Sequence, residues 1–267
     1  MGNNLIDQKL LDSVMTVAAA AAQEILAVYD TDFGVRRKED HSPLTEADMA
    51  AHHCIVDGLG CLDPAWPVIT EESAKLPFAE RAQWRDYWLV DPLDGTREFV
   101  KRNGEFTVNI ALISEHDPVL GVVLVPVTGD CYFAARGLGA FKREGAGKAQ
   151  VIQVRKRPAD HLVVAGSRSH GTPSTADFIQ RLGRTELIAI GSSLKSCLVA
   201  EGRADVYPRF GPTSEWDTAA AQCIVEEAGG QLTDQALEPL RYNTKDSLLN
   251  PSFLAFGDAA EDWRKYM

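Results

Sequence analysis

Cysteines are few in this sequence, and none is placed to form a metal site. The chain has five cysteines in 267 residues, widely scattered, with no Cys-x-x-Cys pair and no histidines nearby at the spacing of zinc ligands. An odd, dispersed set of this kind is typical of reduced thiols. We therefore expect free cysteines, several of them buried.

Long hydrophobic runs are also missing. The longest apolar run near the start, residues 14–22, contains Thr16 and is followed by Gln23 and Glu24. It is too short to cross a hydrocarbon core of ~30 Å, and no basic segment precedes it. The sequence therefore predicts no signal peptide and no transmembrane segment, and it favours a cytoplasmic protein. Peripheral attachment to the inner membrane stays open as an alternative.

Positive charge is in short supply: lysine and arginine number 27 against 38 acidic residues, which gives a formal net charge of −11. Proteins that bind nucleic-acid polymers gain much of their affinity from Lys and Arg that neutralise phosphates, so such polymers are not expected as partners. An acidic protein can still act on a small anionic metabolite if metal ions supply local positive charge. The sequence leaves the oligomeric state open.

What is present is the pattern of a folded α/β enzyme in two parts. Residues 5–29 carry apolar side chains at helical spacing, and residues 106–141 alternate in short β-type runs that indicate an antiparallel meander. Farther on, strand-like and helix-like runs alternate, as in α/β layers. The sequence pattern changes at 151–158, which predicts a boundary between two sub-domains there. We expect an N-terminal α+β sub-domain, 1–153, with the antiparallel sheet, and a C-terminal α/β sub-domain, 154–267.

Acidic side chains fall at the ends of predicted strands or at the start of a predicted helix: Glu71, Asp91, Asp94 and Asp217. Because strand ends meet at one edge of a sheet, these carboxylates are expected to converge on one site. Carboxylates brought together repel each other strongly, so the cluster implies bound cations. Oxygen ligands without a histidine favour Mg²⁺ or Mn²⁺ over zinc.

The strongest local signal is the hexapeptide Asp-Pro-Leu-Asp-Gly-Thr at 91–96. Its two carboxylates can turn toward one site, and Leu93 can offer its backbone carbonyl between them. Gly95 permits close approach of the backbone, and Thr96 opens a predicted helix whose N-terminus is a favourable phosphate site. The segment thus combines metal ligands, a phosphate cradle and a hydroxyl.

Taken alone, the same hexapeptide also fits a plain turn with a capping acid at its start. Two companion segments argue against that reading. Thr-Glu-Ala-Asp at 45–48 places a hydroxyl and a carboxylate on one face of a helix that Thr45 is predicted to cap. Trp-Asp at 216–217 places an acid at a helix start, followed by Glu-Glu-Ala-Gly-Gly at 226–230.

With these motifs, the chain resembles the inositol monophosphatase-like superfamily of metal-dependent, lithium-sensitive phosphatases. The family pattern is an acid pair after a strand, then D-P-[IL]-D-G-[ST], then W-D followed by E-A-G-G, and all three occur here in order at 69–72, 91–96 and 216–230. The resemblance covers nearly the whole chain. It implies a layered α/β/α/β/α sandwich.

The resemblance also implies roles for individual residues. The metal ligands would be Glu71, Asp91, the Leu93 carbonyl, Asp94 and Asp217. The ions would be two or three Mg²⁺, with Mn²⁺ as a substitute and Li⁺ or Ca²⁺ as inhibitors. Thr96, paired with Asp48 directly or through Thr45, would orient and help to deprotonate a metal-activated water, which attacks phosphorus in line without a phosphoenzyme.

Two segments bear on the substrate: 97–109, with its Lys-Arg-Asn-Gly-Glu stretch, and Gly-Ser-Ser-Leu-Lys at 191–195. Both resemble bacterial 3′(2′),5′-bisphosphate nucleotidases of the CysQ type and differ from inositol monophosphatases. The implied reaction converts 3′-phosphoadenosine 5′-phosphate to AMP and phosphate, with the 5′-phosphosulfate form as a further substrate that would give adenosine 5′-phosphosulfate. The substrate-binding residues expected on this basis are Gly95, Thr96, Gly191, Ser192, Ser193, Lys195, Arg209 and Asp217.

A second phosphate needs its own cations, which Lys195 and Arg209 could supply, with hydrogen bonds from the serines. The alternative for both residues is an ordinary solvent-exposed charge. For the protein, the alternatives are an inositol or histidinol phosphatase on the same fold, and a catalytically inactive relative that senses a nucleotide. The second requires the loss of a metal carboxylate or of the Thr96 hydroxyl, and all of these are present.

Overall fold

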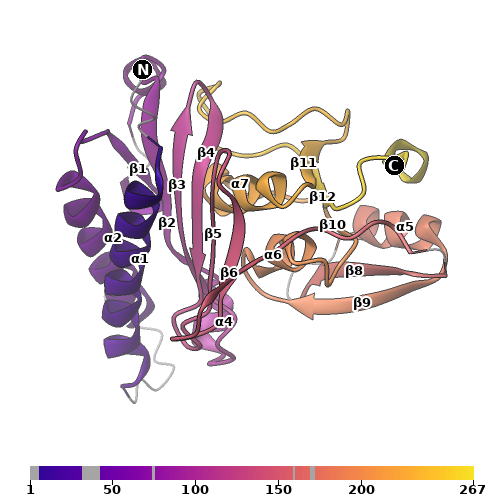
Figure 1. Ribbon diagram of the computed structural model, residues 1–267, viewed down its shortest axis with the longest axis horizontal. Coiled ribbons are helices and arrows are strands. Elements are labelled where there is room, and N and C mark those ends of the chain that lie inside the picture. Colours follow the sequence, from indigo (N-terminus) through magenta and orange to yellow (C-terminus); the bar gives the residue numbers. More distant parts are fainter. Residues whose placement is uncertain (1–5, 32–42, 74–75, 159, 169–171) are drawn as a thin grey trace.

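The computed structural model describes residues 6–31, 43–73, 76–158, 160–168 and 172–267, without the side chains of 43–45. Two β-sheets and three groups of helices form five layers (Figure 1). Helices α1 and α2 cover one face of the first sheet, α6 and α7 lie between the two sheets, and α5 covers the far face of the second sheet. The predicted layered α/β/α/β/α sandwich is confirmed.

The first sheet has seven strands in chain order. They are β1 (Val68–Thr70), β2 (Asp86–Asp94), β3 (Thr107–Ser114), β4 (Asp117–Leu124), β5 (Cys131–Ala135), β6 (Gly139–Arg143) and β7 (Ala149–Val151). β1 is parallel to β2, and every later pair is antiparallel, which confirms the predicted meander. Strands β3 to β5 are almost completely buried because helices cover both faces of the sheet.

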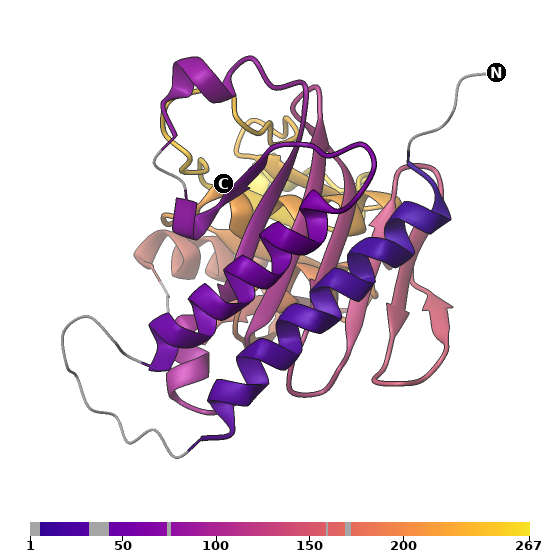
Figure 2. The ribbon, with the colours of Figure 1, turned by 90° about the vertical axis from the view of Figure 1, so that its left-hand side faces the viewer.

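Helices α1 (Gln8–Tyr29) and α2 (Pro43–Gly60) lie side by side on the outer face of this sheet (Figure 2). The Asp7 carboxylate caps α1 by accepting a hydrogen bond from the Leu10 N–H at 2.8 Å. In the described part of the chain, α1 is the one helix long and apolar enough to cross a membrane, and half of that stretch is buried in the fold. α2 begins at Pro43, so the prediction that Thr45 caps it is wrong: proline already suits the first helical position.

The second sheet has the strand order β11-β12-β10-β8-β9. Its strands are β8 (Leu162–Ser167), β9 (Thr185–Ile190), β10 (Val206–Arg209), β11 (Gln231–Asp234) and β12 (Phe253–Phe256). β9, β8 and β10 run parallel, and β12 joins them antiparallel. The remaining elements on this side are α5 (Pro173–Leu182) and the 3₁₀-helix η3 (Trp263–Tyr266), whose aromatic side chains pack with the outer face.

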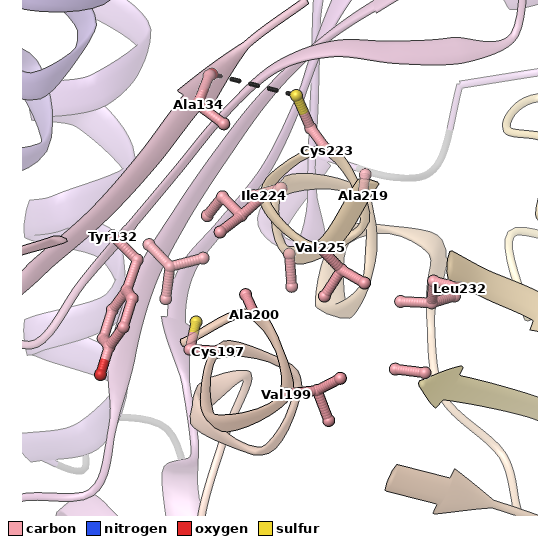
Figure 3. Packing of buried hydrophobic residues seen from close by; sticks show 14 of the residues in the cluster. Tyr132, Ala134, Cys197, Val199, Ala200, Ala219, Cys223, Ile224, Val225 and Leu232 are labelled. Atoms are coloured by element: carbon pink, nitrogen blue, oxygen red, sulfur yellow. Dashed lines mark hydrogen bonds between the residues drawn. The ribbon is translucent and has the colours of Figure 1, made fainter. Parts of the chain in front are cut away.

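Between the sheets, α6 (Leu194–Ala200) and α7 (Ala219–Glu227) are buried almost completely (Figure 3). One apolar cluster joins residues of the first sheet, both helices and the second sheet. The five cysteines are free, and Cys131, Cys197 and Cys223 are buried, as predicted. The Cys223 thiol lies 3.9 Å from the carbonyl oxygen of Ala134 and can donate to it.

Helix α7 and the first sheet approach each other closely through their backbones at Gly121. A Cβ atom added to Gly121 in β4 would lie 2.2 Å from the carbonyl oxygen of Ala220 in α7, far inside van der Waals distance. Only glycine therefore fits at this position. The helix that follows Asp217 is held against the strand without an intervening side chain.

The division into sub-domains 1–153 and 154–267 stays a prediction. The last strand of the first sheet ends at Val151 and the first strand of the second sheet begins at Leu162, so the predicted boundary falls between the sheets. The shared apolar cluster means that each side contributes part of a common core.

A buried arginine ties the short helix α3 (Phe78–Arg81) to the segment after β11. Arg81 is 1% exposed and donates hydrogen bonds to the side-chain oxygen of Asn243 and to the carbonyl oxygens of Lys245 and Asp246. The Asn243 side chain donates back to the Arg81 carbonyl at 2.6 Å, and its N–H donates to the Glu215 carboxylate at 2.7 Å. This network fixes the chain directly before Asp217.

We expect Arg81→Met to lower the free energy of unfolding by about 2–4 kcal/mol, because it leaves several buried acceptors without a donor. Urea denaturation at pH 7 measures the change. Arg85→Met is the matched control: this nearby arginine pairs with Glu115 at 3.0 Å, but its side chain is 71% exposed, so its loss should change stability by less than about 0.5 kcal/mol. Equal effects of the two variants would contradict a structural role for the Arg81 network.

Candidate active site

A cavity of about 270 Å³ opens where the end of β2 meets the turn before α6 and the chain around Asp217. Most residues that the sequence assigned to the site line this cavity: Glu71, Asp91, Leu93, Asp94, Gly95, Thr96, Gly191, Ser192, Ser193, Lys195, Arg209 and Asp217. They come from both halves of the chain. Neither sheet alone therefore forms the site.

The hexapeptide takes its shape from the irregular end of β2. Pairing with β3 is regular up to Asp91 and shifts register before Asp94. The Leu93 N–H turns back and donates to the Asp91 carboxylate at 3.0 Å. Gly95 has φ = 100°, a left-handed conformation that favours glycine, and helix α4 (Thr96–Val100) follows directly. The turn brings Asp91 and Asp94 to the same side.

Asp217 joins them from the other half of the chain. It ends the 3₁₀-helix η2 (Glu215–Asp217), where its carboxylate accepts a hydrogen bond from the Ser214 N–H at 2.8 Å. One carboxylate oxygen from each of Asp91, Asp94 and Asp217 lies within 4.8 Å of the others. Three carboxylate oxygens at this spacing form a donor set suited to a hard divalent cation.

The electrostatics of this cluster also favour a cation. Burial, and then the neighbouring Asp94 and Asp217 carboxylates, raise the pKa of Asp91 well above its usual range. Burial and Asp94 raise the pKa of Asp217 to about 7, against the lowering effect of the Ser214 N–H. Without a cation, protons take up part of the charge. The residues present therefore fit Mg²⁺, which would exchange for those protons.

A hydrogen-bond network holds Asp94. Its Oδ2 accepts from the Ser193 hydroxyl at 2.8 Å and from the Asn109 amide at 3.3 Å. The Asn109 amide also donates to the Ser193 oxygen at 2.8 Å, and Thr107 donates to the Asn109 side-chain oxygen at 2.9 Å. The Ser193 hydroxyl lies equally close to the Asp217 carbonyl oxygen, at 2.8 Å, and its single proton can serve only one acceptor at a time. Ser193 thus links two of the clustered acids.

Glu71 lies on the cavity wall outside the three-acid cluster. It begins the 3₁₀-helix η1 (Glu71–Ser73), directly after β1. Desolvation, then Glu72 and Asp94, raise its pKa, while a hydrogen bond with Trp216 lowers it. Trp216 therefore contacts an acid of the site, and it also packs against the shared core. The assignment of Glu71 as a metal ligand stays a prediction.

Asp48 is not part of the cavity lining. It is buried in α2, where burial and the neighbouring Glu72 raise its pKa to about 8. Thr96 is exposed and lines the cavity, so the predicted pair of Thr96 and Asp48 is not directly hydrogen-bonded within the described part of the chain. Thr45 lies in the first turn of α2, and its side chain is outside the described residues. The catalytic roles of these three residues stay predictions.

The cavity also has a basic wall, which includes the deeply buried Lys195. Lys195 is 6% exposed, its ammonium group donates to the Ser192 carbonyl, and it lies 5.4 Å from the centre of the Tyr207 ring. Burial lowers its pKa, and Asp94 raises it in part. The alternative of a solvent-exposed charge is therefore wrong for Lys195. Arg209 also lines the cavity and donates to the Pro212 carbonyl at 2.9 Å.

Ser192 has an unusual backbone. Its φ is 48°, which is rare for a residue with a side chain, and its hydroxyl oxygen is buried without a hydrogen-bond partner among the described residues. A buried hydroxyl without a hydrogen-bond partner destabilises the fold unless a bound ligand supplies the missing hydrogen bond. The strained turn therefore presents a polar group to the cavity.

Sequence reasoning missed two residues of the site. Asn109 supports Asp94 and lies opposite Asp91 across the β2–β3 pair; the signal was a lone amide inside an apolar strand. Glu98 lines the cavity, is 5% exposed, and acts electrostatically on Lys195. It follows Asp94 by four residues through a turn into α4, a spacing that could have flagged it.

We expect binding of Mg²⁺ to release protons, because metal ligands must be deprotonated and the folded protein raises the pKa of Asp91 and Asp217. For Asp217 the stability gained from the raised pKa is complete below about pH 4 and is lost as pH rises through about 7. The stabilisation by Mg²⁺ should run the opposite way and be larger at pH 8 than at pH 6, with affinity weakening about tenfold per pH unit below 7 for each displaced proton.

Thermal unfolding with and without Mg²⁺ at both pH values measures this effect, and calorimetry in buffers of different ionisation enthalpy counts the protons. Asp217→Asn is the control and should release fewer protons. A stabilisation by Mg²⁺ that does not change with pH would contradict this account of the cluster.

Comparison with known proteins identifies the family of the chain. A sequence model of the inositol monophosphatase family matches residues 7–264. The chain is similar to the 3′(2′),5′-bisphosphate nucleotidase CysQ of Escherichia coli (strain K12), with 49% identity over 246 residues that cover 91% of this chain and 98% of that protein. It is 36% identical over 263 residues to the protein of the same name from Haemophilus influenzae, with 97% of both chains covered.

Solved structures show the same fold. The crystal structure of CysQ from Bacteroides thetaiotaomicron, described as a bacterial member of the inositol monophosphatase family, has a TM-score of 0.86 at 44% identity and covers 95% of this chain and 99% of that one. An inositol monophosphatase from Zymomonas mobilis has a TM-score of 0.78 at 25% identity, with coverage of 97% and 96%. The chain therefore belongs to the inositol monophosphatase family.

Proposed function

We propose that the protein is a Mg²⁺-dependent 3′(2′),5′-bisphosphate nucleotidase that removes one phosphate from 3′-phosphoadenosine 5′-phosphate. The observation that carries this proposal is a single cavity lined both by three clustered carboxylates and by a buried lysine. Relatives that are 49% identical over most of the chain carry the name of this activity. The sulfated nucleotide is proposed as a further substrate.

Asp91, Asp94 and Asp217 would hold the metal, together with Glu71 and the Leu93 carbonyl. When bound, Mg²⁺ supplies a Lewis acid that activates water and offsets charge on the phosphate and on the leaving oxygen. Ser193 and Asn109 keep Asp94 in place through its Oδ2, so the carboxylate is oriented before substrate arrives. Thr96, exposed to the cavity, would orient the attacking water.

The basic wall of the cavity, with Lys195, would bind the second phosphate. Lys195 provides a charge that burial has already desolvated, so its interaction with a phosphate is strengthened by the low local dielectric. Ser192 provides a hydroxyl that has no hydrogen-bond partner among the described residues, and Arg209 lines the same cavity. A substrate with only one phosphate would make no contact with this wall. Mg²⁺ as the metal, inhibition by Li⁺ or Ca²⁺, and a cytoplasmic location are parts of the same proposal.

The experiment that tests the function is phosphate release with Mg²⁺ from 3′-phosphoadenosine 5′-phosphate, inositol 1-phosphate and fructose 1,6-bisphosphate at equal low concentrations. We expect a preference of ~100-fold or more for the nucleotide, which is about 2.7 kcal/mol of transition-state discrimination. Asp94→Asn is the inactive control, because it removes a ligand without adding volume. A preference for inositol 1-phosphate would replace the nucleotidase by an inositol phosphatase with the same metal site, and binding of the nucleotide without turnover would indicate a sensor.

We expect Lys195→Ala to raise KM for 3′-phosphoadenosine 5′-phosphate roughly 10- to 100-fold, the range for loss of a hydrogen bond to a charged group. KM for adenosine 3′-phosphate, which lacks the second phosphate, should change much less. Steady-state kinetics on both substrates measure the difference, and Lys195→Met controls for lost packing against Tyr207. Equal losses on the two substrates would remove Lys195 from the proposed phosphate site.

A further inference from the structure

The Lys-Arg-Asn-Gly-Glu segment at 101–105 contains no residue assigned to the site, yet it directly follows α4, whose residues Thr96 and Glu98 line the cavity. It connects α4 to β3 and folds onto itself. The side-chain oxygen of Asn103 accepts the Glu105 N–H at 3.0 Å, and the Asn103 N–H donates to the Glu98 carbonyl at 3.3 Å. Arg102 and Gly104 have φ values of 54° and 75°. The loop therefore holds a defined shape that presents Glu105.

Glu105 accepts hydrogen bonds from residues of the second sheet. Its Oε2 accepts from the Gly191 N–H at 2.9 Å and from Arg168 Nε at 3.0 Å, and its Oε1 accepts from Arg168 Nη2 at 2.7 Å. The same Arg168 nitrogen donates to the Ala189 carbonyl at 2.8 Å. Two parallel N–H···O bonds between arginine and a carboxylate are strong and directional. One carboxylate thus connects the end of β8, the end of β9 and the turn that follows.

That turn also touches the loop through the backbone. A Cβ atom on Gly191 would lie 2.7 Å from the Glu105 carbonyl oxygen and 2.5 Å from Cγ of Glu98. Gly191 immediately precedes Ser192, whose backbone is left-handed and whose hydroxyl has no hydrogen-bond partner in the described part of the chain, and Lys195 follows one turn later. The position of Glu105 therefore determines where these polar groups stand relative to the acids on β2.

We propose that Glu105, through Arg168 and the Gly191 N–H, is a positioning residue for the second phosphate of the substrate. The inference rests on the proposed nucleotidase function and extends it to a residue that does not line the cavity. Glu105 holds the turn so that Ser192 and Lys195 face the same cavity as the metal acids. Its hydrogen bonds do not reach Asp91, Asp94 or Asp217, so it acts on these acids only indirectly, through Ser193 in the same turn.

The negative charge of Glu105 and its positioning role have opposite effects on the affinity for a phosphate. Glu105 carries a negative charge near a phosphate site, so its removal would by itself raise affinity for a phosphate. If Glu105 acts by positioning, its removal lowers that affinity instead. The sign of the change therefore separates the two effects.

The experiment compares Glu105→Ala and Glu105→Gln with the wild type on 3′-phosphoadenosine 5′-phosphate and adenosine 3′-phosphate. We expect Glu105→Ala to raise KM for the bisphosphate tenfold or more, with kcat and KM for the monophosphate within about twofold. Glu105→Gln keeps an oxygen for the Gly191 N–H and loses the ion pair, so its effect should be smaller. Thermal stabilisation by Mg²⁺ should change far less than KM for the bisphosphate, because Asp91 and Asp217 keep their hydrogen bonds from the Leu93 and Ser214 N–H groups.

Glu115→Ala is the matched control, since it removes an exposed ion pair, with Arg85, that does not border the cavity. If Glu105→Ala does not fold, the isosteric Glu105→Gln decides, with a threefold or larger rise in KM for the bisphosphate alone as support. A lower KM for the bisphosphate, no change in either variant, or equal losses on both substrates would overturn the positioning role. A wild type without preference for the bisphosphate would overturn the proposed function and this inference together.

Discussion

The mutual repulsion of three clustered carboxylates is the constraint on which the rest of the site depends. Asp91, Asp94 and Asp217 stand within 4.8 Å of one another, and Asp91 is 1% exposed. Such an arrangement is unfavourable unless charge is compensated and each oxygen is held. The protein holds them with backbone N–H groups at Leu93 and Ser214. Bound protons or metal ions compensate the negative charge of the three carboxylates.

The same constraint explains why the site needs both halves of the chain. Asp94 is oriented by Asn109 from the first sheet and by Ser193 from the turn before α6. Asp217 is contributed by the segment between β10 and α7, and Ser193 reaches its carbonyl. The acids and the basic wall with Lys195 are thus set on one hydrogen-bonded frame. A chain with a net charge of −11 can in this way offer a local site for an anion.

The layered fold, the antiparallel meander and most of the cavity residues could be predicted from the sequence because their signals are local. The hexapeptide at 91–96 holds two acids, a glycine and a hydroxyl within one turn, and Glu71 and Asp217 are recognisable as acids after a strand and at the start of a helix. Asn109 could not be predicted in this way, since strand register alone places it opposite Asp91. The contact of Glu105 with Gly191 joins residues of different sheets, which no local pattern encodes. The start of α2 was missed because proline at 43 competes with Thr45 as the first residue of the helix.

The backbone contact between Gly121 and Ala220 sets the spacing of the site in a way that side chains do not. Asp217 lies just before α7, and α7 is seated on β4 with no side chain between them. The contact between the two main chains therefore sets the distance between the sheet and Asp217. A side chain at position 121 would push α7 away from β4 and would move Asp217 relative to Asp91 and Asp94.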